Sequence, residues 1–206
     1  MPEVDLEQIT AAIVTGALTG AAVWYRDRRK ERLRHAVPAA ATAQIRQAQI
    51  LTALCSEIGA ARALLIKVHN GGEIPHGGRD LKITALAESD PVPGVPRIAP
   101  EIQGRPILDP EYLRLIHDLH RHRVLLIRTD DLTPGSMLRD EHERAGIASA
   151  WASVVLAEPE RWYMLLCESR HALEPAPAAR AVMRAAAARL SRLVVRDLDL
   201  TLDDTC

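Results

Sequence analysis

The pattern of hydrophobic and polar positions separates an uncharged N-terminal stretch from a longer segment of alternating elements. No charged residue occurs from Ile9 to Tyr25, whereas acidic residues precede this stretch and mostly basic residues follow it. As a helix, the stretch spans roughly 25 Å, slightly less than a hydrocarbon core of about 30 Å. Trp24 and Tyr25 stand at its basic end, where amphipathic rings favour the lipid headgroups. The pattern predicts one transmembrane helix over residues 9–25.

The charges on either side of this helix predict its orientation. Residues 1–8 form a short acidic tail, and residues 26–40 form a basic juxtamembrane segment. Positive residues favour the cytoplasmic side and attract anionic lipid, so we expect a single-pass inner-membrane protein with its N-terminus outside. Two alternatives stay open, because the stretch is only modestly apolar: a buried helix of a soluble protein, and a secretory signal, although a signal needs basic residues before its apolar run.

Small residues recur at four-residue steps within this stretch. Ala12, Gly16 and Gly20 would lie on one helical face, where a second backbone can approach closely. This spacing predicts a homodimer that associates through the membrane helix. The alternative is that a segment rich in alanine and glycine contains the spacing by chance.

The periodicity beyond residue 40 predicts one α+β domain over residues 41–200 and an acidic tail over 201–206. Apolar residues at three- and four-residue steps, such as Ile45, Leu51 and Ile58, predict an amphipathic first helix. Six prolines between residues 91 and 110 predict a loop without regular structure. The expected elements are helices over 41–61, 112–122, 136–145 and 177–197, and strands over 63–68, 81–87, 124–128, 149–157 and 161–168.

The composition limits the classes of function. The 206 residues have a net charge of −1, which argues against general nucleic-acid binding because no basic surplus exists to neutralise phosphates. The chain has no phenylalanine, so its core must be mainly aliphatic. Cys55 and Cys167 lie in apolar patterns and are expected to be core residues rather than a disulfide.

The order of the expected elements resembles that of GAF domains, which are relatives of the PAS sensor fold. The resemblance is carried by residues 145–156, where a helix ends at glycine before a strand, and by residues 162–167 after the turn. It implies an antiparallel sheet with helices on one face and a ligand pocket on the other. It also implies that the first and last helices pack together, often against a second copy. The chain further resembles small membrane-anchored proteins of bacteria and their phages, in which an H-N-G-G segment ends the first strand; here it is His69-Asn70-Gly71-Gly72.

The sequence departs from several branches of the GAF family. It lacks the N-K-F-D-E motif of cyclic-nucleotide binders, a cysteine beside a histidine as in bilin attachment, and the cysteines of GAF-type methionine sulfoxide reductases. The cofactor therefore stays unknown. The sequence contains no recognisable kinase, cyclase or DNA-binding effector, so we expect any output to go through a partner protein.

Polar residues of the kind that bind ligands gather after the first predicted strand. Glycines allow backbone amides to approach an anion, and histidine, asparagine and arginine add donors. The alternative is that Asn-Gly-Gly forms only a tight turn that ends the strand. The candidate ligand-binding residues are His69, Asn70, Gly71, Gly72, His76, Arg79 and Lys82.

Other polar groups give no complete catalytic or metal site. His117 and His120 lie one helical turn apart, but no third ligand completes a zinc pattern, so no metal is expected. Asp130 and Asp131 are expected as turn or cap residues. The acids that follow, Asp140, Glu141 and Glu143, are expected on a solvated face with Arg139 and Arg144.

The combined expectation is a non-catalytic, membrane-anchored cytoplasmic sensor or adaptor that works as a dimer. It would contact membrane lipid and bind a small molecule or a protein. The alternative is a structural scaffold, possibly phage-encoded, that has no small ligand. An enzyme that uses His69 and His76 is the third reading.

Overall fold

The computed structural model describes residues 24–26, 28, 41–73, 79–107, 109–158 and 161–202. Nearly all of the expected membrane helix, with Ala12, Gly16 and Gly20, lies outside these residues, as does His76. Among the described residues, no helix combines the length and the hydropathy that crossing a bilayer requires. The chain divides into two compact units, residues 1–42 and 43–206. In the first unit, the Arg28 guanidinium lies 4.7 Å from the ring centroid of Trp24.

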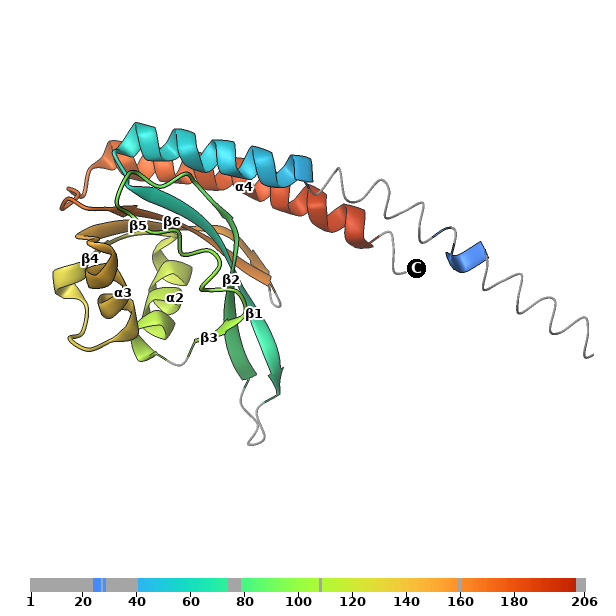
Figure 1. Cartoon of the computed structure of the whole chain (residues 1–206), viewed down its shortest axis with the longest axis horizontal. Helices are drawn as coiled ribbons and strands as arrows, with labels where there is room; N and C mark the ends of the chain where they lie inside the picture. The colour runs from blue at the N-terminus through green and yellow to red at the C-terminus, as the bar shows by residue number, and fades with distance from the viewer. Residues whose placement is uncertain are drawn as a thin grey trace, which may run out of the picture. The chain divides into compact units, whose positions relative to one another are not determined.

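The second unit is built on a six-stranded antiparallel sheet with strand order β3-β2-β1-β6-β5-β4 (Figure 1). This arrangement confirms the predicted α+β class. The elements are a helix over residues 41–58, β1 (Arg62–Glu73), β2 (Arg79–Glu88), β3 (Arg105–Pro106), α2 (Pro110–His122), β4 (Val124–Arg128), the 3-10 helix η1 (Thr129–Asp131), α3 (Met137–Ala145), β5 (Ser149–Glu158), β6 (Arg161–Ser169) and α4 (Pro177–Leu202).

The resemblance implied helices on one face of the sheet, but helices cover both faces. The helix over residues 41–58 lies beside α4 on one face, and α2 and α3 lie on the other (Figure 1). Because both faces are covered, alternate residues of each central strand are buried on opposite sides. Leu64 and Ile66 of β1 belong to the α2–α3 side, whereas Ala63 and Leu65 belong to the side of α4.

Both layers of the core are mainly aliphatic, as the composition predicted. On the α4 side, Met183 and Leu190 are fully buried and pack with Leu51 of the first helix. Cys167 is buried in the same layer and Cys55 is half-buried, which confirms that they are core residues. Ile45 was predicted on the buried face of the first helix, but its side chain is 59% exposed. The buried face is set by Ala43, Gln47, Leu51 and Leu54, and this row turns Ile45 away from the sheet.

The predicted interruption of β1 at Asn70-Gly71-Gly72 is wrong. The strand continues to Glu73, which pairs with Arg79, and a register shift falls between Asn70 and Glu73. The glycines are therefore accommodated by an irregular stretch of the ladder instead of a turn. The proline-rich loop also contains a strand: Arg105 and Pro106 of β3 pair with β2.

Side-chain caps and a left-handed glycine fix the helices on the α2–α3 side. Asp109 caps α2 by accepting a hydrogen bond from the Glu111 amide. Ser136 caps α3 by accepting one from the Arg139 amide, so this cap falls to serine rather than to the predicted aspartates. Gly146 ends α3 with a φ of +65°, a conformation that glycine adopts without strain.

Candidate functional site

The predicted ligand-binding residues that the structure describes, which are all of them except His76, lie on β1 and β2. His69 is directly opposite Lys82 in the ladder, and its Nε2 lies 3.0 Å from the Thr84 hydroxyl. Asn70, Gly71, Gly72 and Arg79 contribute backbone to the same two strands. The structure thus brings His69 and Lys82 together in the ladder, and the hydrogen bond to Thr84 gives His69 a structural role.

A buried ion pair on the α2–α3 side was not predicted from the sequence. Arg62 of β1 and Glu168 of β6 are direct partners in the ladder, and the Arg62 Nε donates to the Glu168 carboxylate. Their side chains are only 1% and 4% exposed. Arg62 also donates through Nη1 to the carbonyl of Pro96, at 2.6 Å, which ties the proline-rich loop to the sheet.

His142 of α3 faces the same carboxylate. Its Nδ1 lies 3.0 Å from the hydroxyl oxygen of Thr129, and this hydroxyl donates to the Ile147 carbonyl at 2.7 Å. Because the hydroxyl proton is used, Nδ1 must carry a proton, and the neutral ring then has its lone pair on Nε2. That buried Nε2 has no hydrogen-bond partner and lies 4.0 Å from Oε1 of Glu168. Burial, with a smaller contribution from Arg62, lowers the pKa of His142 to about 4.

A second polar cluster joins α2, α3 and β3. The Tyr112 hydroxyl donates to Glu141, and Arg105 forms an ion pair with the same carboxylate. Burial and the neighbouring Glu141 raise the pKa of Tyr112 well above its ordinary value. Glu141 is buried, so its predicted place on a solvated face is wrong; α3 is short and turns this residue toward α2.

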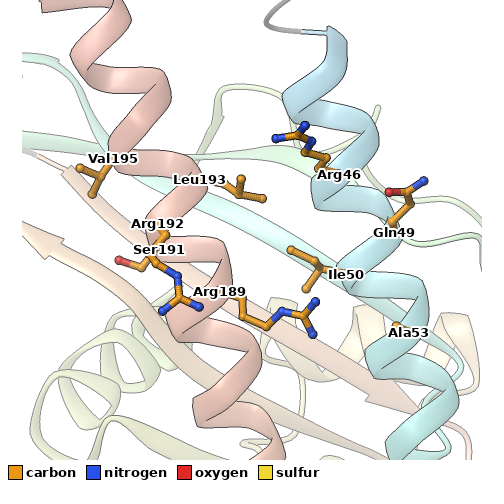
Figure 2. Close-up of a pocket in the computed structure, with 9 residues that line it drawn as sticks. All are labelled: Arg46, Gln49, Ile50, Ala53, Arg189, Ser191, Arg192, Leu193 and Val195. Carbon is orange, nitrogen blue, oxygen red and sulfur yellow. The ribbon is translucent and has the colours of Figure 1, made fainter.

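A groove of about 810 Å³ runs between the helix over residues 41–58 and α4 (Figure 2). Its lining combines apolar side chains with three arginines and contains no acidic residue. The lining residues are Arg46, Gln49, Ile50, Ala53, Arg189, Ser191, Arg192, Leu193 and Val195. Val195 is 37% exposed, and the exposed Ile45 adjoins Arg46 on the first helix. The groove was not predicted from the sequence, because it depends on how the two helices pair.

Several polar groups of these sites are engaged with one another. Within the described part of the chain, no three histidine, cysteine, aspartate or glutamate residues converge to hold a metal ion. His117 is exposed and pairs with Asp118. The buried carboxylates of Glu168 and Glu141 are each engaged by an arginine. The groove offers both apolar contact and charge.

No family model and no curated protein matches the sequence. Solved structures do match the fold. The phycocyanobilin-bound GAF domain of a cyanobacterial phytochrome aligns with a TM-score of 0.54 and 14% identity, over 82% of this chain and 91% of that one. The blue-light-absorbing form of the PixJ GAF domain of Thermosynechococcus elongatus has a TM-score of 0.54 and 11% identity, over 81% and 94%.

A third structure is the GAF domain region of a Geobacter sulfurreducens PCA protein that is provisionally classed as a membrane protein. It aligns with a TM-score of 0.51 and 18% identity, over 77% of this chain and 96% of that one. The chain has a GAF-like fold. In this GAF-like domain, the space between the sheet and α2–α3 is filled by the chain's own side chains, among them Met164, Leu119 and Leu138. Both described cysteines lie on the opposite side of the sheet, in the layer beneath α4.

Proposed function

We propose that the chain is a membrane-anchored, non-catalytic sensor or adaptor whose GAF-like domain works through its paired helices. The groove between residues 41–58 and α4 carries this proposal, because it places apolar side chains and three arginines on one accessible surface. Central burial of apolar contacts with charged groups at the edge is typical of protein interfaces. The uncharged stretch over residues 9–25 would hold this surface near the cytoplasmic face of the membrane.

The occupant that we propose for the groove is a second copy of the chain. The groove is lined by Arg46, Arg189 and Arg192, whereas α4 carries Asp197 and Asp199 just beyond Val195. Arg46 and Val195 line the same groove. The C-terminal end of α4, which carries the two aspartates, therefore lies near the start of the first helix. In a parallel pair of anchored chains, this difference in charge along α4 would favour association of the two copies. The membrane face of Ala12, Gly16 and Gly20 would add a second contact.

A charge placed in the groove should separate the two copies. We expect Val195→Arg to weaken dimerisation of the full-length chain in detergent by at least about tenfold, because it adds a fourth cation and removes apolar contact. Sedimentation equilibrium measures the effect. Leu113→Arg is the matched control, since Leu113 is an apolar residue of α2 that is 43% exposed and should leave the dimer unchanged. Equal association of both variants and the unmodified chain would contradict the groove as interface.

A structural scaffold without a small ligand is the second candidate function. Its support is the filled α2–α3 side of the sheet, where eighteen buried residues form one cluster. Two of the GAF neighbours are bilin-bound, by their descriptions. In this chain, Cys55 and Cys167 belong to the layer beneath α4, and Cys167 is buried in it. A covalently attached bilin on the α2–α3 side does not fit these residues.

A ligand screen distinguishes the sensor from the scaffold. A ligand that binds only the folded state at one hundred times its Kd stabilises it by about 2.7 kcal/mol. We therefore expect a saturable rise in the melting temperature of the full-length chain with a metabolite of the correct class. The rise should persist in His69→Ala if the hairpin plays no part, and it should disappear if His69 binds the ligand. No shift across broad sets of nucleotides, organic acids and tetrapyrroles would favour the scaffold.

A further inference from the structure

Where His142 approaches the Arg62–Glu168 pair, its buried Nε2 has no hydrogen-bond partner. His142 donates from Nδ1 to Thr129, which leaves the unprotonated Nε2 facing Glu168 Oε1 across 4.0 Å. Neither atom offers a proton to the other. The Glu168 carboxylate already accepts from Arg62. No hydrogen bond therefore joins His142 to Glu168 in the closed site.

The surroundings oppose that proton while the site is closed. The charged groups that face His142 are Arg62 from β1 and Glu168 from β6, and Thr129 of η1 is its neutral partner. Glu141 on α3 and Glu88 on β2 act on Glu168. A second cation beside Arg62 would be buried with a single carboxylate between them, and burial of an incompletely balanced charge is costly.

We propose that His142 is a proton-operated switch that holds α3 and η1 on the sheet when neutral and releases them when protonated. Release would bring the imidazole into water, where its charge is solvated and no longer close to Arg62. The segments that it frees are short: α3 contains nine residues and η1 three. Arg62 also donates to the Pro96 carbonyl, so the ion pair that faces His142 contacts the proline-rich loop as well. This inference rests on the buried cluster and is independent of the proposed dimer.

The sign of the effect follows from the two protonation states. The released His142 has an ordinary pKa near 6.5, whereas the closed one has a pKa of about 4. Release therefore takes up a proton between these values, and its equilibrium rises as the pH falls through this window. The limiting slope is tenfold per pH unit, which gives roughly 300-fold over the whole window. Burial raises the pKa of Glu168 and acts in the opposite direction, so the comparison must be made against a variant that keeps Glu168.

Hydrogen exchange of the full-length chain between pH 6.5 and 4 tests the proposal. His142→Asn keeps a donor for Thr129 but cannot titrate, and His117→Asn is the control because His117 is 67% exposed. After correction for intrinsic exchange, we expect α3 amides of the unmodified chain to open up to roughly 300-fold more than those of His142→Asn. The His117→Asn chain should behave as the unmodified one. An equal pH dependence in all three chains would overturn the proposal, as would a rise shared equally by β1 and β6, which indicates global unfolding.

A second measurement needs no variant at position 142. The imidazole carbon resonances of His142 in the unmodified chain report its titration directly. We expect a midpoint near pH 4, accompanied by line broadening in α3 and η1. A midpoint near 6.5 with unchanged α3 resonances would overturn the switch.

Discussion

Replacing Glu168 with alanine should destabilise the GAF-like domain by about 3–5 kcal/mol, because it leaves the Arg62 guanidinium buried without a counter-charge. Arg62 is 1% exposed and cannot lose its proton, so the charge has no route to neutrality. Within the described residues, the Pro96 carbonyl would then be the hydrogen-bond acceptor that remains for Arg62. Urea unfolding at pH 7, monitored by circular dichroism, measures the loss as a lower midpoint at constant slope.

Two comparisons separate this effect from a general loss of packing. Asp90→Ala removes one partner of the exposed Arg97–Asp90 pair, whose side chains are 56% and 83% exposed, and should change stability by less than about 1 kcal/mol. The double substitution Arg62→Met with Glu168→Leu removes both charges. We expect it to recover at least about 2 kcal/mol of the loss, because an apolar pair of similar volume often replaces a buried ion pair at little cost. A double variant as unstable as Glu168→Ala would contradict the electrostatic explanation.

The sequence predicted most of the secondary structure, because buried apolar residues recur along the chain with the period of the helix or strand that carries them. The bounds of β4 were predicted correctly, because its apolar run begins directly after Arg123 and the strand ends directly before Thr129. The predicted apolar face of α4 has six residues, of which four are buried and two, Val182 and Leu193, are half-buried; the buried ones are Met183, Ala186, Leu190 and Val194. These elements pack an aliphatic face against the sheet, so local pattern and tertiary structure agree.

The features missed from the sequence are those that depend on distant partners. β3 has only two residues, and nothing in its own pattern distinguishes it from the surrounding loop; it exists because Lys82 and Ile83 of β2 pair with it. Glu141 resembles its charged neighbours in α3, but Tyr112 and Arg105 reach it from 29 and 36 positions away in the chain. A charge at the end of an apolar strand, as at Glu168, was the one sequence signal available for the buried cluster.

The first helix shows the same limit on a finer scale. The pattern placed Ile45 on the buried face, yet the helix turns Gln47 inward and leaves Ile45 exposed. An apolar stripe predicts that a helix is amphipathic, but its rotation is decided by the surface that it meets. The exposed Ile45 adjoins Arg46, which lines the groove, and for this reason its exposure enters the proposed interface. The position of an exposed isoleucine could not be predicted without knowing where α4 lies.

Two charges inserted into the uncharged N-terminal stretch should detach the protein from membranes. We expect the full-length chain to sediment with the membrane fraction after ultracentrifugation of lysed cells and to need detergent for release. Arginine near the centre of a membrane helix costs about 2.5–3.5 kcal/mol, so Val14→Arg with Leu18→Arg should oppose insertion by roughly 5–7 kcal/mol. This cost exceeds the free energy that the modestly apolar stretch gains on insertion into the membrane. The double variant should therefore move to the supernatant.

The matched control places the same charges outside the apolar stretch. Ala39→Arg with Ala41→Arg also adds two arginines, but at the end of the basic segment, where positive charge favours the cytoplasmic side and anionic lipid. This variant should stay with the membrane fraction. An unmodified chain that remains soluble without detergent would refute the anchor while leaving the GAF-like fold and its groove intact. In that case residues 9–25 would have to bury their apolar side chains against protein, because an exposed stretch of this length promotes aggregation.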